Sequence, residues 1–476
     1  MVDDTLARWS GRPYSLPGVS VAIGDGRSKL AARDTDYDVI HIGFTDTLSA
    51  NSAAGFALTE ANLYTLEAYD EYFDHLGPRG VLVVSRLRRL VGDEALRATV
   101  LALAALERRG VAHPERNVVV LLGKDIFNEV FGTVLARETP WSAAELDRIR
   151  GLARERGDGV AYAPGGPYQL EWAQLAGAPG WDAFCHGYRL NVCPPTDDRP
   201  FFFNMTRLAD LTSPPPQGSF YATDPLRVLA LTLALLAVLC AAAFGLPIAL
   251  VPRGQRPPVR RMGFFAAIGF GFLALEIALI QRLVLFLGFP TYALSVVLFA
   301  LLLSTGIGSL LSTRARAPRR ALTAALVIAC VLMLAGAFWL QPLLRALIDL
   351  PFAARVIVSI ALLAPLGLAL GMAMPTGLTR LAGLHEGAVP WAWAVNGVAS
   401  VLASVAAVAI AITWGFSTVM LVSTACYLLA LADVRLAPWP TRAQAIAGAS
   451  GSRSSAASMS SSENSGSSSE PERYAS

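Results

Sequence analysis

The chain has 476 residues, of which 54% are apolar and only 16% are charged. Water-soluble proteins have about a quarter of their residues charged, so this composition excludes a wholly soluble globular protein. The formal net charge of +3 is too small to indicate nucleic-acid binding, and we expect no nucleic-acid partner. The charge deficit is concentrated between residues 225 and 434, where the apolar runs are nearly continuous.

Strand and helix patterns alternate in residues 1–164 and predict an α/β domain. Ser142 and Glu145 form a capping box, which marks the start of one of the helices. Strands that alternate with helices of this length indicate a mainly parallel sheet covered on both faces. The predicted strands are 19–23, 37–42, 80–85, 117–122 and 129–135, and the predicted helices are 58–76, 93–109 and 142–156.

Residues 165–224 are rich in Gly, Pro and aromatic residues and predict a connector, which contains the sequence TDDRPFFF at 196–203. Seven apolar segments follow, each near the length of about 20 residues that a helix needs to cross a bilayer. Residues 225–434 therefore predict an all-α transmembrane bundle in contact with lipid. The serine-rich tail, 435–476, is predicted to be disordered. The apolar segments are 226–251, 262–287, 291–312, 321–343, 352–376, 391–413 and 416–432.

Aromatic residues gather near the ends of the apolar segments. They include the tryptophans Trp391, Trp393 and Trp414, and the connector adds the aromatic run 201–203. Such residues are enriched where a membrane meets water. We therefore expect them to form an interfacial belt.

The arginines between the apolar segments predict the orientation of the bundle. They cluster in alternate loops, as at 253–261 and 314–320, and the positive-inside rule then places the C-terminus in the cytoplasm of a cell membrane protein. Seven spans would put the α/β domain outside, yet residues 1–15 lack the apolar core of a signal peptide. Either one segment does not span, or the natural chain has further helices ahead of Met1; we favour the second.

Two of the five cysteines lie in the soluble part. Cys185 and Cys193 are eight residues apart, without the second pair that a zinc site would need, so we predict no metal site. Whether they form a disulfide depends on the compartment, and the sequence leaves this open. The other three lie in apolar runs, as small apolar residues do.

Several short segments in both parts of the chain form a recognisable set. In the α/β part the segments are VAIGDGR at 21–27, YDVI at 37–40, ALTE at 57–60 and GVLVV at 80–84. Further along they are TDDRPF at 196–201, EIALIQR at 276–282, PTYA at 290–293 and PWAWAVNG at 390–397. Together these segments resemble spermidine synthases and, more closely, their multi-pass membrane relatives, and the resemblance spans roughly residues 19–430. It implies a Rossmann-like, methyltransferase-like domain that binds decarboxylated S-adenosylmethionine or S-adenosylmethionine and transfers an aminopropyl group to an amine.

The chain departs from this family in two places. The family's glycine-rich turn and ribose-binding acid would precede Val19, so the resemblance implies an N-terminally truncated, incomplete nucleotide pocket. Asp25 and Gly26 remain as residues that face the adenine in the family. The alignment also places Gly43 where the family has its aspartate base and Asp46 where it has a second aspartate, a possible substrate contact. Glycine cannot accept a proton, and loss of a positioned base removes about 10²–10⁴-fold of rate.

Glu276 lies within the second apolar segment. A carboxylate there is costly unless it is neutral, paired or facing a polar cavity. We group it with Gln281, Arg282 and Asn396 as a candidate transmembrane polar site, although Arg282 is about 9 Å further along the helix and on another face. The site would serve either interhelical hydrogen bonding or the binding of a small cation, a polyamine or a proton.

Three functions are compatible with these patterns. We favour a spermidine synthase-like membrane protein without aminopropyltransferase activity, whose α/β domain serves ligand sensing or assembly. The first alternative is a membrane-anchored aminopropyltransferase or another S-adenosylmethionine-dependent transferase with an amine or adenosyl ligand. The second is a transporter for a polyamine or proton that uses Glu276. The sequence fixes neither the substrate nor the oligomeric state.

Overall fold

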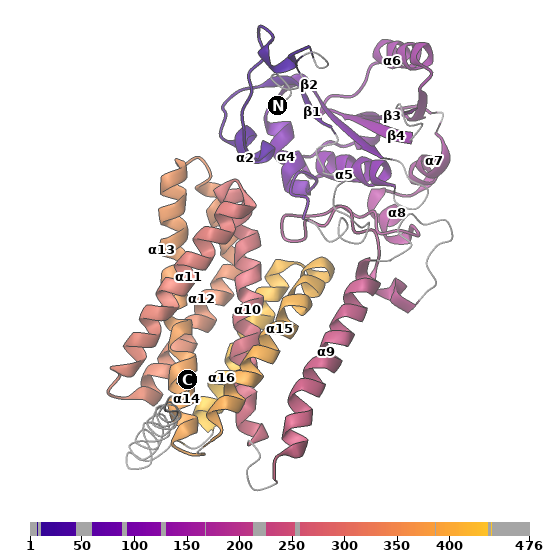
Figure 1. Ribbon diagram of the computed structural model, residues 1–476. Coiled ribbons are helices and arrows are strands. Elements are labelled where there is room, and N and C mark those ends of the chain that lie inside the picture. Colours follow the sequence, from indigo (N-terminus) through magenta and orange to yellow (C-terminus); the bar gives the residue numbers. More distant parts are fainter. Residues whose placement is uncertain are drawn as a thin grey trace, which may run out of the picture. The chain divides into compact units, whose positions relative to one another are not determined.

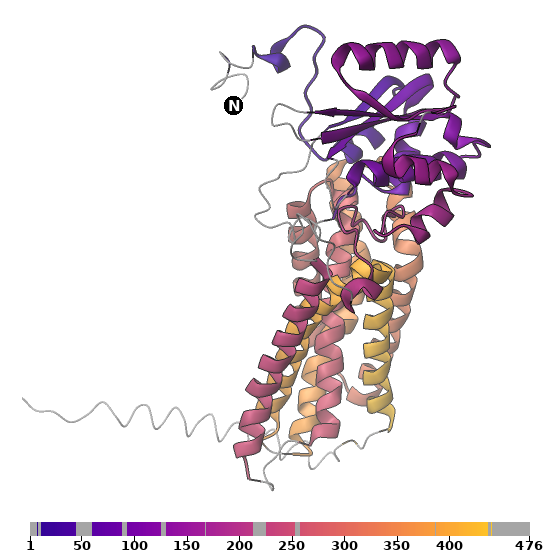
Figure 2. The same cartoon turned by 90° about the vertical axis from the view of Figure 1, so that its right-hand side faces the viewer.

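The computed structural model describes residues 7, 11–43, 60–87, 93–124, 130–166, 168–212, 225–252, 258–385, 387–436 and 439. An α/β domain is followed by seven long apolar helices (Figure 1 and Figure 2). The chain divides into two compact units. Unit 1 contains Met1–Val228 together with two helix-hairpin tips, Gln281–Ala293 and Pro342–Arg355, and unit 2 contains the remaining helical residues.

A five-stranded mixed sheet forms the centre of the α/β domain. Its strands are β1 (Tyr37–Ile42), β2 (Leu76–Leu87), β3 (Val118–Lys124), β4 (Val130–Ala136) and β5 (Gly159–Tyr162), in the spatial order β1-β2-β4-β3-β5. Only the β1–β2 pair is parallel, whereas β4 is antiparallel to β2 and β3, and β5 is antiparallel to β3. The prediction of a mainly parallel sheet is therefore wrong. The strands β3 and β4 are too close in the chain for the crossover that a parallel pair requires.

Helices cover the two faces of the sheet unequally. Helix α5 (Glu94–Arg108) lies on one face, where its apolar residues join the main core with Leu82 of β2 and Val134 of β4. Helix α6 (Ala143–Arg156) lies on the opposite face, as both views show, and its Leu146 packs against Val119 of β3 (Figure 1 and Figure 2). The predicted helices 93–109 and 142–156 are confirmed, and Ser142 and Glu145 form the expected capping box.

The predicted strand over 19–23 is wrong. Val19, Val21 and Ile23 lie in extended chain outside the sheet, and their side chains are 45%, 58% and 88% exposed. An alternating apolar pattern becomes a strand only if another strand pairs with it, and among the described strands β1 pairs with β2 alone. The strand β1 is therefore an edge of the sheet, and its Val39 is 55% exposed.

The predicted helix over 58–76 is shorter than its apolar pattern suggested. Helix α4 (Leu66–Asp74) begins after Thr65, whose hydroxyl accepts a hydrogen bond from the amide of Ala68. Thr65 is thus the N-cap residue that satisfies one of the first free amides of the helix. Residues 44–59, which include Asp46, lie outside the described residues.

Seven spans in the second half are long and apolar enough to cross a membrane, and this finding supports the prediction of a multi-pass membrane protein. The fifth of these spans, Phe352–Ala382, consists of two helices, because one ends at Gly371 and the next begins at Ala373. Most of the predicted disordered tail lies outside the described residues. The helices are α9 (Pro225–Leu250), α10 (Val259–Leu287), α11 (Pro290–Thr313), α12 (Pro318–Ala346), α13 (Phe352–Gly371), α14 (Ala373–Ala382), α15 (Val389–Trp414) and α16 (Phe416–Leu436).

Glycines allow α11 and α13 to pack closely in unit 2. A Cβ atom added to Gly308 would lie 2.2 Å from the carbonyl oxygen of Leu368, and one added to Gly371 would lie 2.1 Å from that of Thr305. Both distances are far below van der Waals contact, so the two backbones meet where only glycine fits.

The predicted connector folds as part of the α/β domain. It forms helices α7 (Leu170–Gly177) and α8 (Trp181–Gly187), and Cys185 and Cys193 are joined by a disulfide. The side chains of Phe201, Phe202 and Phe203 are at most 2% exposed. The predicted role of these three phenylalanines in an interfacial belt is therefore wrong: the ring of Phe202, for example, lies 4.7 Å from that of Tyr64.

Candidate functional site

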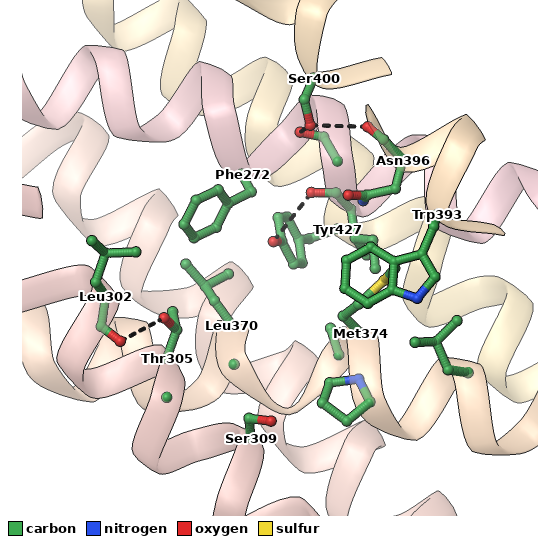
Figure 3. A pocket seen from close by; sticks show the side chains of 17 residues that line it. Phe272, Leu302, Thr305, Ser309, Leu370, Met374, Trp393, Asn396, Ser400 and Tyr427 are labelled. Atoms are coloured by element: carbon green, nitrogen blue, oxygen red, sulfur yellow. Dashed lines mark hydrogen bonds between the residues drawn. The ribbon is translucent and has the colours of Figure 1, made fainter. Parts of the chain in front are cut away.

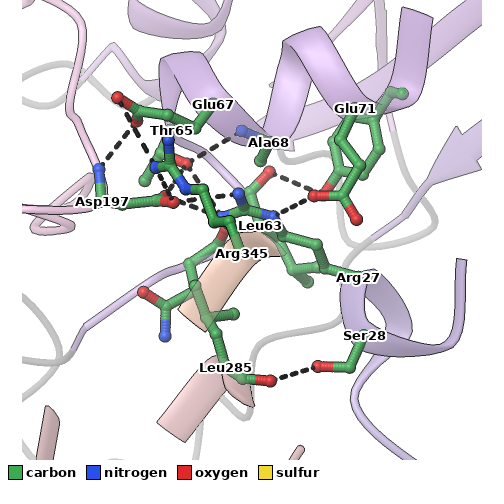
Figure 4. A network of polar contacts seen from close by, with 12 residues as sticks. Arg27, Ser28, Leu63, Thr65, Glu67, Ala68, Glu71, Asp197, Leu285 and Arg345 are labelled. Atoms are coloured by element: carbon green, nitrogen blue, oxygen red, sulfur yellow. Dashed lines mark hydrogen bonds and ion pairs between the residues drawn. The ribbon is translucent and has the colours of Figure 1, made fainter. Parts of the chain in front are cut away.

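Asp197, from the TDDRPFFF sequence, is the centre of a cluster of polar side chains in unit 1 (Figure 4). Its two carboxylate oxygens accept hydrogen bonds from the two terminal nitrogens of Arg27, at 2.7 and 3.0 Å. The Thr65 hydroxyl donates to one of these oxygens at 2.6 Å, and Arg345 donates to the other at 2.6 Å. We call this group, with Glu67 and Glu71, the Asp197 cluster.

Three separate parts of the chain supply the partners of Asp197. Helix α2 (Gly26–Ala31) carries Arg27 in its first turn, and helix α4 carries Glu67 and Glu71. The Nε of Arg27 contacts Glu71 at 2.7 Å, and Glu67 accepts a hydrogen bond from the backbone amide of Asp197 at 2.8 Å. Arg345 comes from the Pro342–Arg355 tip of unit 1. Every arginine in the cluster thus faces a carboxylate.

Burial and neighbouring charges shift the pKa values of Asp197, Arg27 and Glu71, and the net direction depends on which effect is larger. Burial opposes ionisation of Asp197, but the charges of Arg27 and Arg345 outweigh it and lower the Asp197 pKa. Burial likewise opposes the charge of Arg27, but Asp197 and Glu71 raise its pKa. At Glu71 burial dominates over Arg27 and raises the pKa. Asp197 and Arg27 are therefore a charged, hydrogen-bonded pair at neutral pH.

Asp198 makes a second link to a hairpin tip. Its carboxylate accepts a hydrogen bond from Arg282 at 2.5 Å, in the Gln281–Ala293 tip of unit 1. The hydroxyl of Ser28 donates to the carbonyl oxygen of Leu285 in the same tip, at 3.0 Å (Figure 4). The two consecutive aspartates therefore hold one tip each, and both side chains have stabilising partners.

The side chain of Arg97 holds the connector in place through hydrogen bonds to its backbone. This buried side chain of α5 donates hydrogen bonds to the backbone carbonyl oxygens of Cys193, Phe201, Phe202 and Asn204. Burial, with a smaller effect of the Arg199 charge, lowers the pKa of Arg97 to about 9, so the guanidinium is still charged at neutral pH. Arg97 is not among the residues predicted above, although an arginine among the apolar residues of a predicted helix indicates a buried polar role.

The residues predicted to face an adenosyl ligand serve local structure. The Asp25 carboxylate accepts hydrogen bonds from the backbone amide and hydroxyl of Ser28, at 2.8 and 2.9 Å, and is the N-cap of α2. Gly26 is the first residue of that helix, and Gly43 directly follows β1. The predicted contact at Asp46 lies outside the described residues.

The four residues of the predicted transmembrane polar site are divided between the two units. Arg282 pairs with Asp198, and Gln281 belongs to the same tip of unit 1. Asn396 of α15 donates to the carbonyl oxygen of Phe265 in α10, at 3.1 Å. Glu276 is 9% exposed, and its carboxylate makes no hydrogen bond to any residue that the structure describes.

A cavity of about 550 Å³ lies within unit 2 (Figure 3). Helices α10, α11, α13, α14, α15 and α16 contribute to its wall. The wall combines apolar side chains such as Phe272 and Met374 with the neutral polar side chains of Thr305, Asn396 and Ser400. Asn396 is thus the one residue of the predicted polar site that lines the cavity in the described part of the chain.

No protein-family model matches the chain. The curated proteins contain no match either. The roles of these residues therefore follow from their geometry and chemistry.

Proposed function

We propose that this membrane-embedded protein is spermidine synthase-like and that its α/β domain serves assembly rather than aminopropyl transfer. The exposed edge of β1 carries this proposal. Parallel sheets are normally covered on both faces, yet Val39 of β1 is 55% exposed. Among the described strands β1 also has a partner along one edge only. An edge strand with exposed apolar residues is a template for strand addition, and the proposed occupant is a β-strand of another polypeptide.

Two residues argue against transferase chemistry. Gly43 follows β1 where the family resemblance requires an aspartate base, and the carboxylate of Asp25 is engaged in capping α2. A positioned base is needed to take the proton from the attacking amine. Equilibrium dialysis with radiolabelled S-adenosylmethionine and its decarboxylated form tests this point. Saturable binding that Asp25→Ala abolishes would favour the transferase alternative.

The Cys185–Cys193 disulfide supports a location of the α/β domain outside the cytoplasm. Structural disulfides form and persist in oxidising compartments. The arginine-rich loops between the helices point to the same orientation, because they place the C-terminus in the cytoplasm and seven spans then place the α/β domain on the other side.

Site-specific crosslinking tests the assembly role. A photoreactive amino acid is placed at position 39 of the protein in its native membrane. It should crosslink to a single segment of one polypeptide. The crosslinks should fall on alternate residues of that segment, because successive strand residues face opposite ways. The same group at Leu152, an exposed apolar residue of α6, is the control. Crosslinks from position 39 that match those from position 152, or that reach lipid alone, would overturn the proposal. A crosslink to a second copy would identify a homo-oligomer.

Cation transport is a second candidate because Glu276, a residue only 9% exposed, places a carboxylate within a candidate membrane span. Such a group is by default a functional-site candidate in a membrane. The test compares Glu276→Gln with Glu155→Gln, an exposed position of α6, in proteoliposomes that take up spermidine or protons. Transport through this site requires that only the first variant lose uptake; equal uptake by both variants counts against it.

A further inference from the structure

The cavity of unit 2 has a wall without ionised side chains. Among the described residues that line it there is no carboxylate, ammonium, guanidinium or imidazole group. Its volume of about 550 Å³ is within the usual range of ligand sites. Charged ligands require charged or hydrogen-bonding partners when they leave water, so the wall favours an uncharged occupant.

Two hydroxyl groups in the wall, those of Ser400 and Thr305, offer acceptors to a ligand (Figure 3). The single hydroxyl proton of Ser400 points to the backbone carbonyl oxygens of Gly269 and Asn396, at 3.1 and 2.9 Å. The Thr305 hydroxyl donates to the carbonyl oxygen of Leu302 at 3.1 Å. A hydroxyl that donates still has lone pairs. The oxygens of both side chains can therefore accept a hydrogen bond from a ligand.

The break between α13 and α14 adds a backbone acceptor to the same wall. Gly371 and Pro375 both line the cavity. Proline has no N–H, so Pro375 cannot donate the helical hydrogen bond that the carbonyl of Gly371 would otherwise receive. Interrupted helices in membrane proteins are tolerated where they line a cavity, and there they commonly form binding sites.

We propose that this cavity binds the chain of a neutral lipid whose polar end carries a hydroxyl group. The apolar wall receives the hydrocarbon, and the hydroxyl donates to the acceptors of Ser400, Thr305 or the Gly371 carbonyl. An anionic headgroup would need a cationic partner and a cationic one would need a carboxylate, and neither group is present among the described residues of the wall. The inference concerns unit 2 alone and is independent of the role of the β1 edge.

Gly306 provides a way to close the cavity without disturbing the helices. It lines the cavity, and a Cβ atom added to it would meet nothing within 4 Å. The variant Gly306→Leu should therefore fill part of the cavity with little strain. Gly397 is the matched control, because a Cβ atom there also meets nothing within 4 Å and the residue does not line the cavity.

The experiment uses three photoreactive probes with the same long hydrocarbon chain and different ends, an alcohol, a carboxylic acid and an amine. The full chain in lipid nanodiscs is irradiated with each probe, and the labelled peptides are identified by mass spectrometry. We expect the alcohol to label residues of the cavity wall at least about tenfold more than the acid or the amine. Unlabelled long-chain alcohol should compete, and spermidine should not.

The variants give the decisive comparison. Gly306→Leu should reduce cavity labelling about tenfold, while Gly397→Leu retains it. Ser400→Ala, which removes one acceptor and little volume, should reduce the preference for the alcohol. Equal labelling of the Gly306→Leu and Gly397→Leu proteins, labelling spread evenly over the lipid-facing helices, or a preference for the acid or amine would each overturn the proposal. A thermal unfolding measurement on each variant identifies one that fails to fold, and in that case the Ser400→Ala comparison decides.

Discussion

The guanidinium of Arg27 and the carboxylate of Asp197 form a two-point ion pair, although 170 positions separate them in the chain. Their side chains are only 6% and 2% exposed. Paired hydrogen bonds between arginine and a carboxylate fix geometry as well as charge. This pair therefore defines where the N-terminal helix α2 and the TDDRPFFF sequence meet.

Replacing Asp197 with asparagine should destabilise the protein by about 3–5 kcal/mol, because it leaves the buried Arg27 charge uncompensated. The measurement is the unfolding midpoint of the purified protein in detergent. Asp147→Asn, at an exposed carboxylate of α6, is the control and should change stability by less than about 0.5 kcal/mol. Similar midpoints for the two variants would show that Asp197 is not a structural centre.

Acid should weaken the fold through Asp197. Its pKa in the folded protein is lowered by Arg27 and Arg345 against the effect of burial, so its stabilisation is present above the unfolded value of about 3.9 and is lost as the pH falls below about 4. Glu71, whose pKa burial raises, acts in the opposite direction. Unfolding measured from about pH 7 to pH 3 should show a loss that is smaller in Asp197→Asn. A profile identical to that of the unaltered protein would contradict this assignment.

Replacing Arg97 with methionine should cost at least about 3 kcal/mol, because several buried carbonyl oxygens lose their donor and each such loss costs about 1–3 kcal/mol. Arg108→Met, at a half-exposed position of the same helix, should cost less than about 1 kcal/mol, as exposed ion pairs do. Unfolding midpoints and protease sensitivity of the connector provide the measurement. The expectation fails if both variants lose the same stability.

The disulfide predicts a thiol count. Under denaturing, non-reducing conditions, protein from its native membrane should react with a maleimide at three cysteines, which are Cys240, Cys330 and Cys426. After reduction all five should react. A gel-shift maleimide measures both numbers. Five reactive thiols before reduction would place the α/β domain in a reducing compartment.

The close contact between α11 and α13 predicts different effects for two neighbouring glycines. Gly308→Ala would force its methyl group against the backbone of Leu368 and should cost about 1–3 kcal/mol through overpacking. Gly306→Ala meets open space and should have almost no effect. Thermal unfolding of the two variants in the same detergent makes the comparison. Equal stability would mean that the helices separate at little cost.

The sequence predicted what local composition determines. Hydropathy alone located the seven spans to within a few residues, except that the fifth extends further to Ala382. The pair Ser142 and Glu145 located a helix start, because a capping box acts over three residues. Asp93 likewise begins α5, where the predicted helix starts.

The sequence could not predict features that depend on distant partners. The pattern at 19–23 has the alternation of a strand, but pairing depends on a neighbouring strand that the pattern does not encode. The antiparallel orientation of β4 relative to β2 and β3 could not be predicted from a local pattern either. The Asp197 cluster joins residues from helix α2, helix α4 and a hairpin tip, so its two arginine partners were not linked to Asp197 by any local motif. The role of Arg97 depended on carbonyl groups about a hundred positions away.

Unit 1 includes the two hairpin tips. One truncation of the chain therefore cannot isolate the α/β domain together with all its partners. A polypeptide that stops at Thr212 would retain Asp197 and Asp198 but lose Arg345 and Arg282. The buried carboxylate of Asp197 and the part-exposed one of Asp198 would then lack part of their counter-charge, and the stability of the isolated domain would be lower. A single protease cut between residues 212 and 225, in contrast, should leave two complementary fragments that co-migrate until they are denatured.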